Sequence, residues 1–131
     1  MKYKIIVLLC VLSSCSTPNE CPELKYNSIN KLTTLNGLAY TGRCTVYRDG
    51  YKVSVQQYLN GVDYGNWVFY FPNGEIETKG KFRNGKRVGK WKYYYESGKI
   101  KQISSYSKLG DRQGKWIEYD EDGKVTKNIR Y

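Results

Sequence analysis

The sequence contains no histidine among its 131 residues, and it has only one methionine and three prolines. Histidine is the usual general base near neutral pH and the commonest metal ligand, so its absence removes the first candidate for most hydrolytic and metal-dependent mechanisms. The sequence also lacks a Gly-x-Ser-x-Gly element, a glycine-rich phosphate loop and the ligand spacing of a zinc site. We therefore expect no enzymatic activity, no cofactor and no metal ion.

Long hydrophobic runs are also lacking. The run Ile5–Leu12 would span roughly 12 Å as a helix, far less than the bilayer core of about 30 Å. It follows two basic residues, Lys2 and Lys4. A short apolar run behind a positively charged start predicts a signal peptide rather than a membrane-spanning helix.

The end of this run reads Leu12-Ser13-Ser14-Cys15 and resembles the bacterial lipoprotein box, in which a diacylglycerol is attached to the cysteine and cleavage falls just before it. The resemblance implies a signal peptide over residues 1–14 and a membrane anchor on Cys15, with palmitate among its acyl chains. Ser16 rather than an aspartate follows, which by similarity to sorting rules in two-membrane bacteria implies the outer membrane. The alternative is an ordinary signal peptide with a cysteine near its end. Which side of the membrane the domain faces is left open.

Two further cysteines, Cys21 and Cys44, remain after the predicted cleavage and lipidation. An exported protein reaches a compartment that permits disulfides. A Cys21–Cys44 bridge would attach the N-terminal segment to the first repeat. The alternative is two free thiols with Cys44 buried, and the separation of the Cα atoms decides between them.

The rest of the sequence repeats itself, with tryptophans 24 and 25 residues apart. Each unit has a Gly-x-Trp element, a tyrosine three residues after the tryptophan, a turn glycine four residues later and an aromatic residue eight positions beyond that glycine. These landmarks are Trp67, Trp91 and Trp116; Tyr70, Tyr94 and Tyr119; Gly74, Gly98 and Gly123; and Phe82, Tyr106 and Tyr131. Two aromatic-rich runs joined by a turn predict one β-hairpin per unit and no helix.

A degenerate copy precedes these units and has Cys44 in place of the tryptophan. Tandem Gly-x-Trp-x-x-Tyr-x-x-x-Gly units of this length resemble the bacterial variant of the MORN repeat, from about Asn36 to Tyr131. The resemblance implies an all-β fold in which tandem β-hairpin repeats form an elongated antiparallel meander or open solenoid sheet. It also implies a scaffold or binding surface. We divide the chain into the signal peptide, a lipidated linker and strand-bearing cap over residues 15–35, and a repeat domain over residues 36–131.

The aromatic residues of the repeats are predicted to align. On a regular strand Trp91, Tyr93 and Tyr95 share one face, and Lys90 and Lys92 share the other. Aromatic residues of neighbouring hairpins would then form a ladder. The ladder either holds together a protein with little core, through cross-strand pairs, or offers a platform for a sugar or a protein.

Positive charge is concentrated in one part of the chain. The net charge is +10, and between Lys79 and Lys101 the basic residues face a single acidic residue, Glu96. Such a region attracts an anionic partner: an acidic protein, an anionic glycan or lipid phosphates. The alternative is a solvated face that prevents aggregation of strands. Nucleic acid is disfavoured because the signal peptide exports the protein. The candidate partner-binding residues are Trp67, Trp91, Tyr93, Lys79, Lys81, Arg83, Lys86, Arg87, Lys90 and Lys92.

Four functional hypotheses follow, in descending order of support. The first is a non-catalytic binding or scaffold lipoprotein that presents an aromatic and basic sheet face to a protein or an anionic envelope partner. The second is an antitoxin or immunity-like protein that captures a toxic protein in the envelope. The third is a purely structural spacer, and an enzyme comes last. A repeat frame carries little information about its ligand, so the partner and the oligomeric state stay open.

Overall fold

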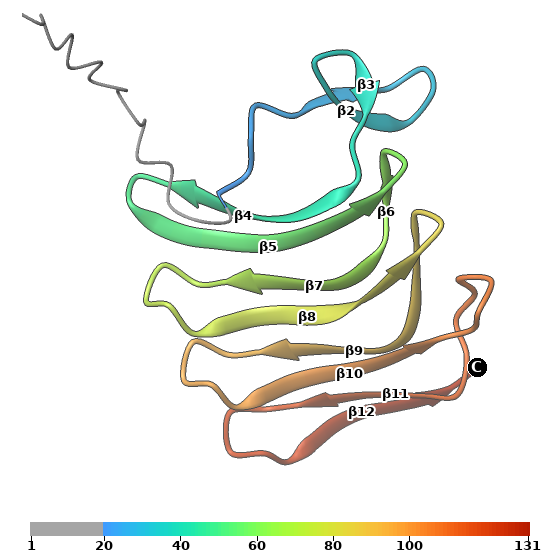
Figure 1. The fold of residues 1–131 in the computed structure, drawn as a ribbon. Coiled ribbons are helices and arrows are strands. Elements are labelled where there is room, and N and C mark those ends of the chain that lie inside the picture. The colour runs from blue at the N-terminus through green and yellow to red at the C-terminus, as the bar shows by residue number, and fades with distance from the viewer. Residues whose placement is uncertain (1–19) are drawn as a thin grey trace, which may run out of the picture.

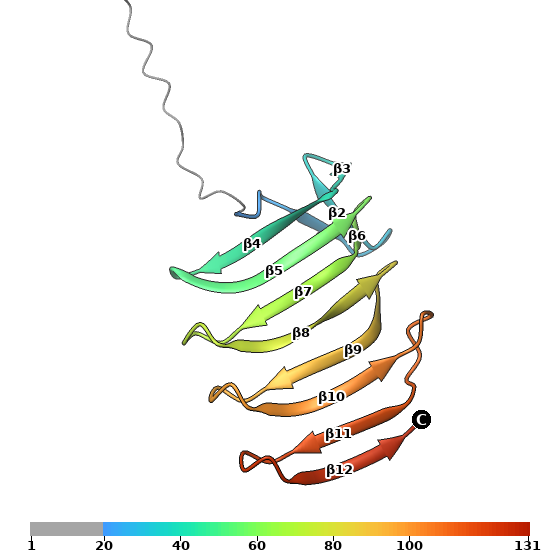
Figure 2. The same ribbon diagram turned by 60° about the horizontal axis from the view of Figure 1, so that its bottom comes forward.

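The computed structural model describes residues 20–131, so the predicted signal peptide and the lipid site at Cys15 lie outside the described residues. These described residues form two antiparallel sheets and no helix, which confirms the predicted all-β fold. Accordingly, no helix within residues 20–131 is long and apolar enough to cross a membrane. Figures 1 and 2 show the strands from β4 to β12 stacked one after another in a single curved layer.

The large sheet has nine strands, in the order β12-β11-β10-β9-β8-β7-β5-β4, with β6 paired to β5. Every pair on this path is antiparallel, and neighbours on it are consecutive in the sequence except β5 and β7, which the short β6 separates; the predicted meander of hairpins is thus confirmed. The strands are β4 (Gly42–Arg48), β5 (Tyr51–Leu59), β6 (Val62–Asp63), β7 (Gly65–Tyr70), β8 (Ile76–Arg83), β9 (Lys86–Tyr94), β10 (Ile100–Tyr106), β11 (Lys115–Tyr119) and β12 (Val125–Arg130).

The glycine of each Gly-x-Trp element has a structural cause. Gly65, Gly89 and Gly114 have φ angles of 69°, 67° and 65°, in the left-handed region that side chains with a Cβ rarely adopt. Each of them lies two residues before the tryptophan: Gly65 begins β7, Gly89 lies within β9 and Gly114 directly precedes β11. The motif therefore combines a backbone requirement at the glycine with a packing requirement at the tryptophan.

The N-terminal cap is a small sheet of three strands: β1 (Lys25–Asn27), β2 (Leu32–Leu35) and β3 (Leu38–Ala39). It joins the large sheet near the turn after β5, where the Thr33 amide donates to the Gly61 carbonyl at 2.7 Å. The Gly61 amide in turn donates to the Tyr40 carbonyl at 2.7 Å. The strand content expected for this segment is thus present.

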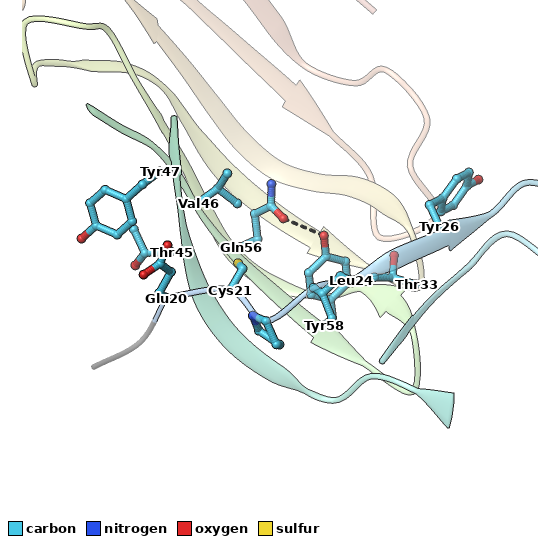
Figure 3. A pocket seen from close by; sticks show the side chains of 11 residues that line it. Glu20, Cys21, Leu24, Tyr26, Thr33, Thr45, Val46, Tyr47, Gln56 and Tyr58 are labelled. Atoms are coloured by element: carbon cyan, nitrogen blue, oxygen red, sulfur yellow. Dashed lines mark hydrogen bonds between the residues drawn. The ribbon is translucent and has the colours of Figure 1, made fainter. Parts of the chain in front are cut away.

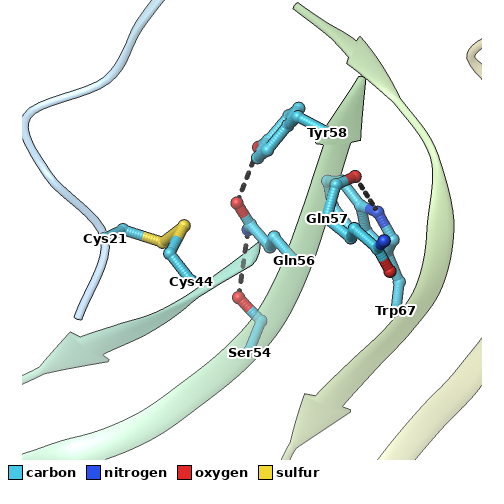
Figure 4. Close-up of a disulfide and its surroundings, with 7 residues drawn as sticks. All are labelled: Cys21, Cys44, Ser54, Gln56, Gln57, Tyr58 and Trp67. Atoms are coloured by element: carbon cyan, nitrogen blue, oxygen red, sulfur yellow. Dashed lines mark hydrogen bonds between the residues drawn. A yellow bond between two sulfur atoms is a disulfide. The ribbon is translucent and has the colours of Figure 1, made fainter. Parts of the chain in front are cut away.

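A disulfide fastens the segment before the cap to the outer edge of β4. Cys21 and Cys44 are bonded, with Cα atoms 4.6 Å apart, inside the usual range for a disulfide. The Cys21 amide also donates to the Thr45 carbonyl at 2.8 Å. Figure 4 shows the bridge beside Ser54 and Gln56 of β5. Of the two alternatives for these cysteines, the structure contains the bridge.

The aromatic residues form a continuous series of ring contacts along one face of the large sheet. Tyr58, Trp67, Phe82 and Trp91 contact one another in this order, edge to face, with ring centroids 5.0 to 5.4 Å apart. Trp91 is completely buried and Trp67 is 7 % exposed. Edge-to-face contacts of this kind stabilise aromatic pairs beyond the effect of burial alone. In a single-layer sheet, this series takes the place of a central core.

Each tryptophan also binds the preceding hairpin through its indole. The Nε1 atoms donate to main-chain carbonyls at equivalent places: Trp67 to Gln57 at 2.9 Å, Trp91 to Lys81 at 3.2 Å and Trp116 to Ser105 at 3.0 Å. A buried indole N–H needs such a partner. The tryptophan therefore joins one repeat to the next, which explains why it recurs with the repeat period.

Candidate functional site

The candidate partner-binding residues lie on two opposite faces of the sheet. Cross-strand partners share a face, whereas successive residues of a strand point to opposite faces. The pairs Trp67–Gly80 and Ser104–Trp91 define one face, which we call the aromatic face. The pairs Val68–Lys79 and Lys79–Lys92 define the other, which we call the basic face. Trp67, Phe69, Phe82, Trp91 and Tyr93 lie on the aromatic face, and Lys79, Lys81, Arg83, Lys90 and Lys92 lie on the basic face.

The prediction of one surface that combines these aromatic residues and the lysines is wrong for Trp91 and Tyr93, whose side chains point away from the lysines. Trp67, which is 7 % exposed, is among the residues that line a hollow with the lysines. The charged window was defined along the chain, whereas the pleat sends successive side chains to opposite faces. Trp91 is 0 % exposed, so its side chain offers no surface to a partner. The ladder has the packing role that was one of its two predicted interpretations.

Arg87 belongs to the packing of the aromatic face. Its guanidinium lies 4.5 Å from the centre of the Trp91 ring, and its Nη1 donates to the Tyr93 hydroxyl at 3.0 Å. Burial raises the pKa of Tyr93, and the positive charge of Arg87 partly opposes this rise. Arg112 repeats the arrangement one unit later, 4.8 Å from the Trp116 ring and 3.1 Å from the Tyr131 hydroxyl. Arg87 thus covers the outer side of the Trp91 ring.

The basic face contains a hollow of about 540 Å³, which we call the basic groove. Two apolar side chains, Val68 and Val88, contribute to its lining, together with Trp67, Gly80 and Gly89. Its cations come from three strands: Arg43, Lys79, Lys81, Lys90 and Lys92.

No carboxylate contributes to the lining of the basic groove. Among residues 20–131 the structure gives none of its five cations an ion pair; the pair that it contains joins Lys127 to Glu118 at 3.5 Å, elsewhere in the sheet. Lys79 and Lys92 are direct cross-strand partners. Like charges in this position oppose each other. An anion placed between them would reduce that repulsion.

Arg43 was not among the predicted residues, because it precedes Lys79 by more than one repeat. It nevertheless occupies the middle position of the degenerate Gly-x-Cys element, and Asn66 and Lys90 occupy the same position in the next two units. The structure brings these three residues into one groove. The repeat alignment therefore contained the signal that would have identified Arg43.

The remaining predicted residues lie beside the groove. Arg83 lines a smaller hollow with Lys81, Val88, Tyr64 and Lys108. Lys86 is exposed and packs close to Gly110 of the turn before β11. They extend the positive surface toward one end of the strands.

A second hollow, of about 360 Å³, lies on the other face between the disulfide segment and β5 (Figure 3). Its polar groups have partners within the protein: the Tyr58 hydroxyl donates to Gln56 Oε1 at 2.7 Å, and Gln56 Nε2 donates to Ser54 Oγ at 3.0 Å. Burial, with a smaller contribution from Asp63, raises the pKa of Tyr58 to about 12. Because these groups bond to one another, we interpret this hollow as a seam between cap and sheet.

Within the part of the chain that the structure describes, no three acidic, cysteine or histidine side chains come together as metal ligands. Every buried polar side-chain atom of these residues has a hydrogen-bond partner. The basic groove stands out among the described residues because its positive charges have no carboxylate beside them.

Comparison with known proteins identifies the repeat. The family model of the MORN repeat variant matches residues 63–84, 87–108 and 112–131. No curated protein matches the chain. Two crystal structures contain similar parts: accessory secretory protein 1, 2 and 3 in Streptococcus pneumoniae, and a GtfA/B complex bound to UDP and GlcNAc. Their identities are 16 % and 13 %, with TM-scores of 0.43 and 0.39. Each comparison covers 81 % of this chain but only 22 % and 26 % of the other, about a quarter of its length.

Proposed function

Residues 63–131 carry three tandem copies of the MORN repeat variant, and from this premise we propose that the protein is a non-catalytic binding lipoprotein of the cell envelope. A lipid on Cys15 holds it to a membrane, and the basic groove binds an anionic partner. The observation that carries the proposal is the groove itself. It has five cations and no carboxylate in its lining.

The central position of the lysines favours binding over a purely solvating role. Lysines protect sheet edges from unwanted pairing. Lys79, Lys81, Lys90 and Lys92, however, lie on β8 and β9, and both strands are paired on both sides. Protection of an edge therefore does not account for them, whereas attraction of an anion does.

The anchor and the groove are compatible in distance. Cys21 is fixed to β4, and the chain from Cys15 to Glu20 spans at most about 17 Å when fully extended. Arg43 of the groove directly precedes Cys44, the other half of the disulfide. The anchored protein would thus hold the β4 edge of the sheet, and one end of the groove, near the membrane.

Lipidation is tested by metabolic labelling of the full chain with a palmitate analogue. We expect label and detergent-phase partitioning in the wild type and neither in Cys15→Ala. Equal labelling of both would disprove the anchor.

Groove binding is tested with the mature chain, residues 15–131 carrying Cys15→Ser, which contains both sheets and the disulfide. The probes are polyglutamate, polygalacturonate and inorganic polyphosphate at moderate salt. We expect at least one to bind and Lys90→Gln/Lys92→Gln to weaken that binding about tenfold, since each exposed ion pair contributes up to about 1 kcal/mol. The control Lys25→Gln/Lys124→Gln removes the same charge from exposed positions outside the groove. No binding of any probe, or equal loss in both variants, would refute the proposal.

A further inference from the structure

The basic groove is part of a longer row of polar side chains that crosses the whole large sheet. Four hairpins each contribute one cross-strand pair on the basic face: Arg43–Gln57, Asn66–Lys81, Lys90–Ser105 and Lys115–Arg130. The first member of each pair is the middle residue of Gly-x-Trp or its degenerate copy. The repeat therefore places these pairs one after another, perpendicular to the strands. We call these eight residues the polar row.

Resting on the proposed function, we propose that the polar row is an extended binding track for a linear acidic glycan. The glycan would lie across the strands, with its middle in the basic groove and its end on Lys115 and Arg130. Its carboxylates or sulfates would meet the cations of the row. Its hydroxyls would meet the neutral members, Gln57, Asn66 and Ser105.

The length and direction of the row suit a polymer better than a compact ligand. Adjacent strands lie about 4.8 Å apart, so eight strands separate Arg43 from Arg130 by about 34 Å. The groove accounts for the part between β4 and β9. One polar residue on every strand gives a repeat comparable with the length of a single pyranose unit, so successive sugars would meet equivalent positions.

The composition of the row distinguishes a glycan from a denser polyanion. Five members are cations and three are neutral side chains that donate hydrogen bonds, as sugar hydroxyls require, and can also accept them. No member is acidic. Polyphosphate has no hydroxyl groups along its chain, so it would leave the three neutral members without a matching partner. A glycan whose sugars carry both carboxylates and free hydroxyls matches the mixed row.

The side chains of the row are available for a ligand. Arg43, Asn66, Lys81, Lys90, Lys115 and Arg130 are exposed. Within the described residues 20–131, no hydrogen bond or ion pair engages the side chains of these six. Binding would therefore replace contacts with water, not contacts with the protein. The tryptophans that hold the repeats together lie on the other face, so a ligand on the row leaves the packing intact.

The test uses the mature chain with Cys15→Ser and a series of galacturonate oligomers of increasing length, followed by calorimetry. We expect affinity to increase with length until the oligomer spans the sheet. We expect Lys115→Gln/Arg130→Gln to weaken the longest oligomer about tenfold and the shortest bound oligomer less than twofold. The control Lys25→Gln/Lys124→Gln removes equal charge from exposed positions outside the row and should leave the whole series unchanged.

The results separate this inference from the proposed function. If short and long oligomers bind equally well, or if Lys115→Gln/Arg130→Gln leaves the longest oligomer unaffected, the track is refuted while the groove stands. Tighter, length-dependent binding of polyphosphate, with no binding of galacturonate oligomers, would refute the glycan and retain an anionic partner. Loss of all binding only in Lys90→Gln/Lys92→Gln, with no length dependence, would confine the site to the basic groove.

Discussion

Substitution of Gly80 by alanine tests the packing of the repeats more directly than any other change. Gly80 lies on β8 with φ outside the left-handed region, so alanine fits the backbone, and in a strand it would ordinarily stabilise by about 0.5 to 1 kcal/mol. An added Cβ, however, would come within 3.0 Å of three atoms of the Trp91 indole. Trp91 is fully buried, between Phe82 and Arg87, and has little freedom to move.

Overpacking of this kind costs about 1 to 3 kcal/mol, so we expect a net loss of about 1 to 2 kcal/mol and a fall in Tm of about 5 to 10 °C. Thermal unfolding of the disulfide-bonded mature chain, followed by tryptophan fluorescence, measures it. In a Trp91→Phe background the same Gly80→Ala change should cost less than half as much, since the smaller ring leaves room. An unchanged or raised Tm in Gly80→Ala, or equal costs in both backgrounds, would refute the close packing of Gly80 on Trp91.

Three further measurements address the rest of the fold. Reduction of the disulfide should lower stability by about 3 kcal/mol, by the loop-entropy estimate, and a reduced protein with unchanged Tm would contradict this. The pKa of Tyr58 is about 12 against an ordinary 10.0, so its contribution to stability is complete below pH 10 and is lost as the pH rises from 10 to 12. Tyr58→Phe should remove that part of the pH dependence. Identical stability–pH profiles for the wild type and the variant would contradict this. Arg87→Gln should lower the free energy of unfolding by about 1 kcal/mol and raise the pKa of Tyr93 further. The control Arg83→Gln, on the basic face, should do neither. If the two variants behave alike, the stabilising contact of Arg87 with Trp91 and Tyr93 is refuted.

The fold was predictable because the landmarks of the repeat report physical requirements that recur in each unit. The glycine of Gly-x-Trp needs a left-handed φ, the tryptophan joins neighbouring hairpins, and the turn glycines close the hairpins. Equivalent turns confirm the register, since the amides of Gly74, Gly98 and Gly123 donate to the carbonyl three residues earlier in every unit. Hairpin identity and order follow from local sequence, because the strands from β4 to β12 pair with strands close to them in the sequence.

The candidate site was less predictable because it depends on which face each side chain occupies and on the pairing between repeats. The charged window between Lys79 and Lys101 joined residues that the pleat separates, and it left out Arg43, which pairing brings into the groove from an earlier strand. The disulfide was undecided for a similar reason. Its formation depends on a Cα separation of 4.6 Å across the edge of β4, which no spacing in the sequence reports.

Within Gly-x-Trp the glycine and the tryptophan serve the fold, whereas the middle residue serves ligand binding in the proposed function. In the three Gly-x-Trp units the glycine has a left-handed φ and the tryptophan packs on the aromatic face, so both are constrained by the fold. In the degenerate copy Gly42 lies outside the left-handed region and Cys44 forms the disulfide. The middle residue points to the basic face and varies from arginine through asparagine to lysine. Since surface changes away from packed features alter stability by less than about 0.5 kcal/mol, substitutions at Asn66 or Lys90 can change the ligand without changing the sheet. We therefore expect Lys90→Gln/Lys92→Gln to retain the Tm of the wild type, because neither side chain takes part in the packing of the aromatic face. If the Tm is retained, a loss of binding in this variant reports on ligand recognition and not on unfolding.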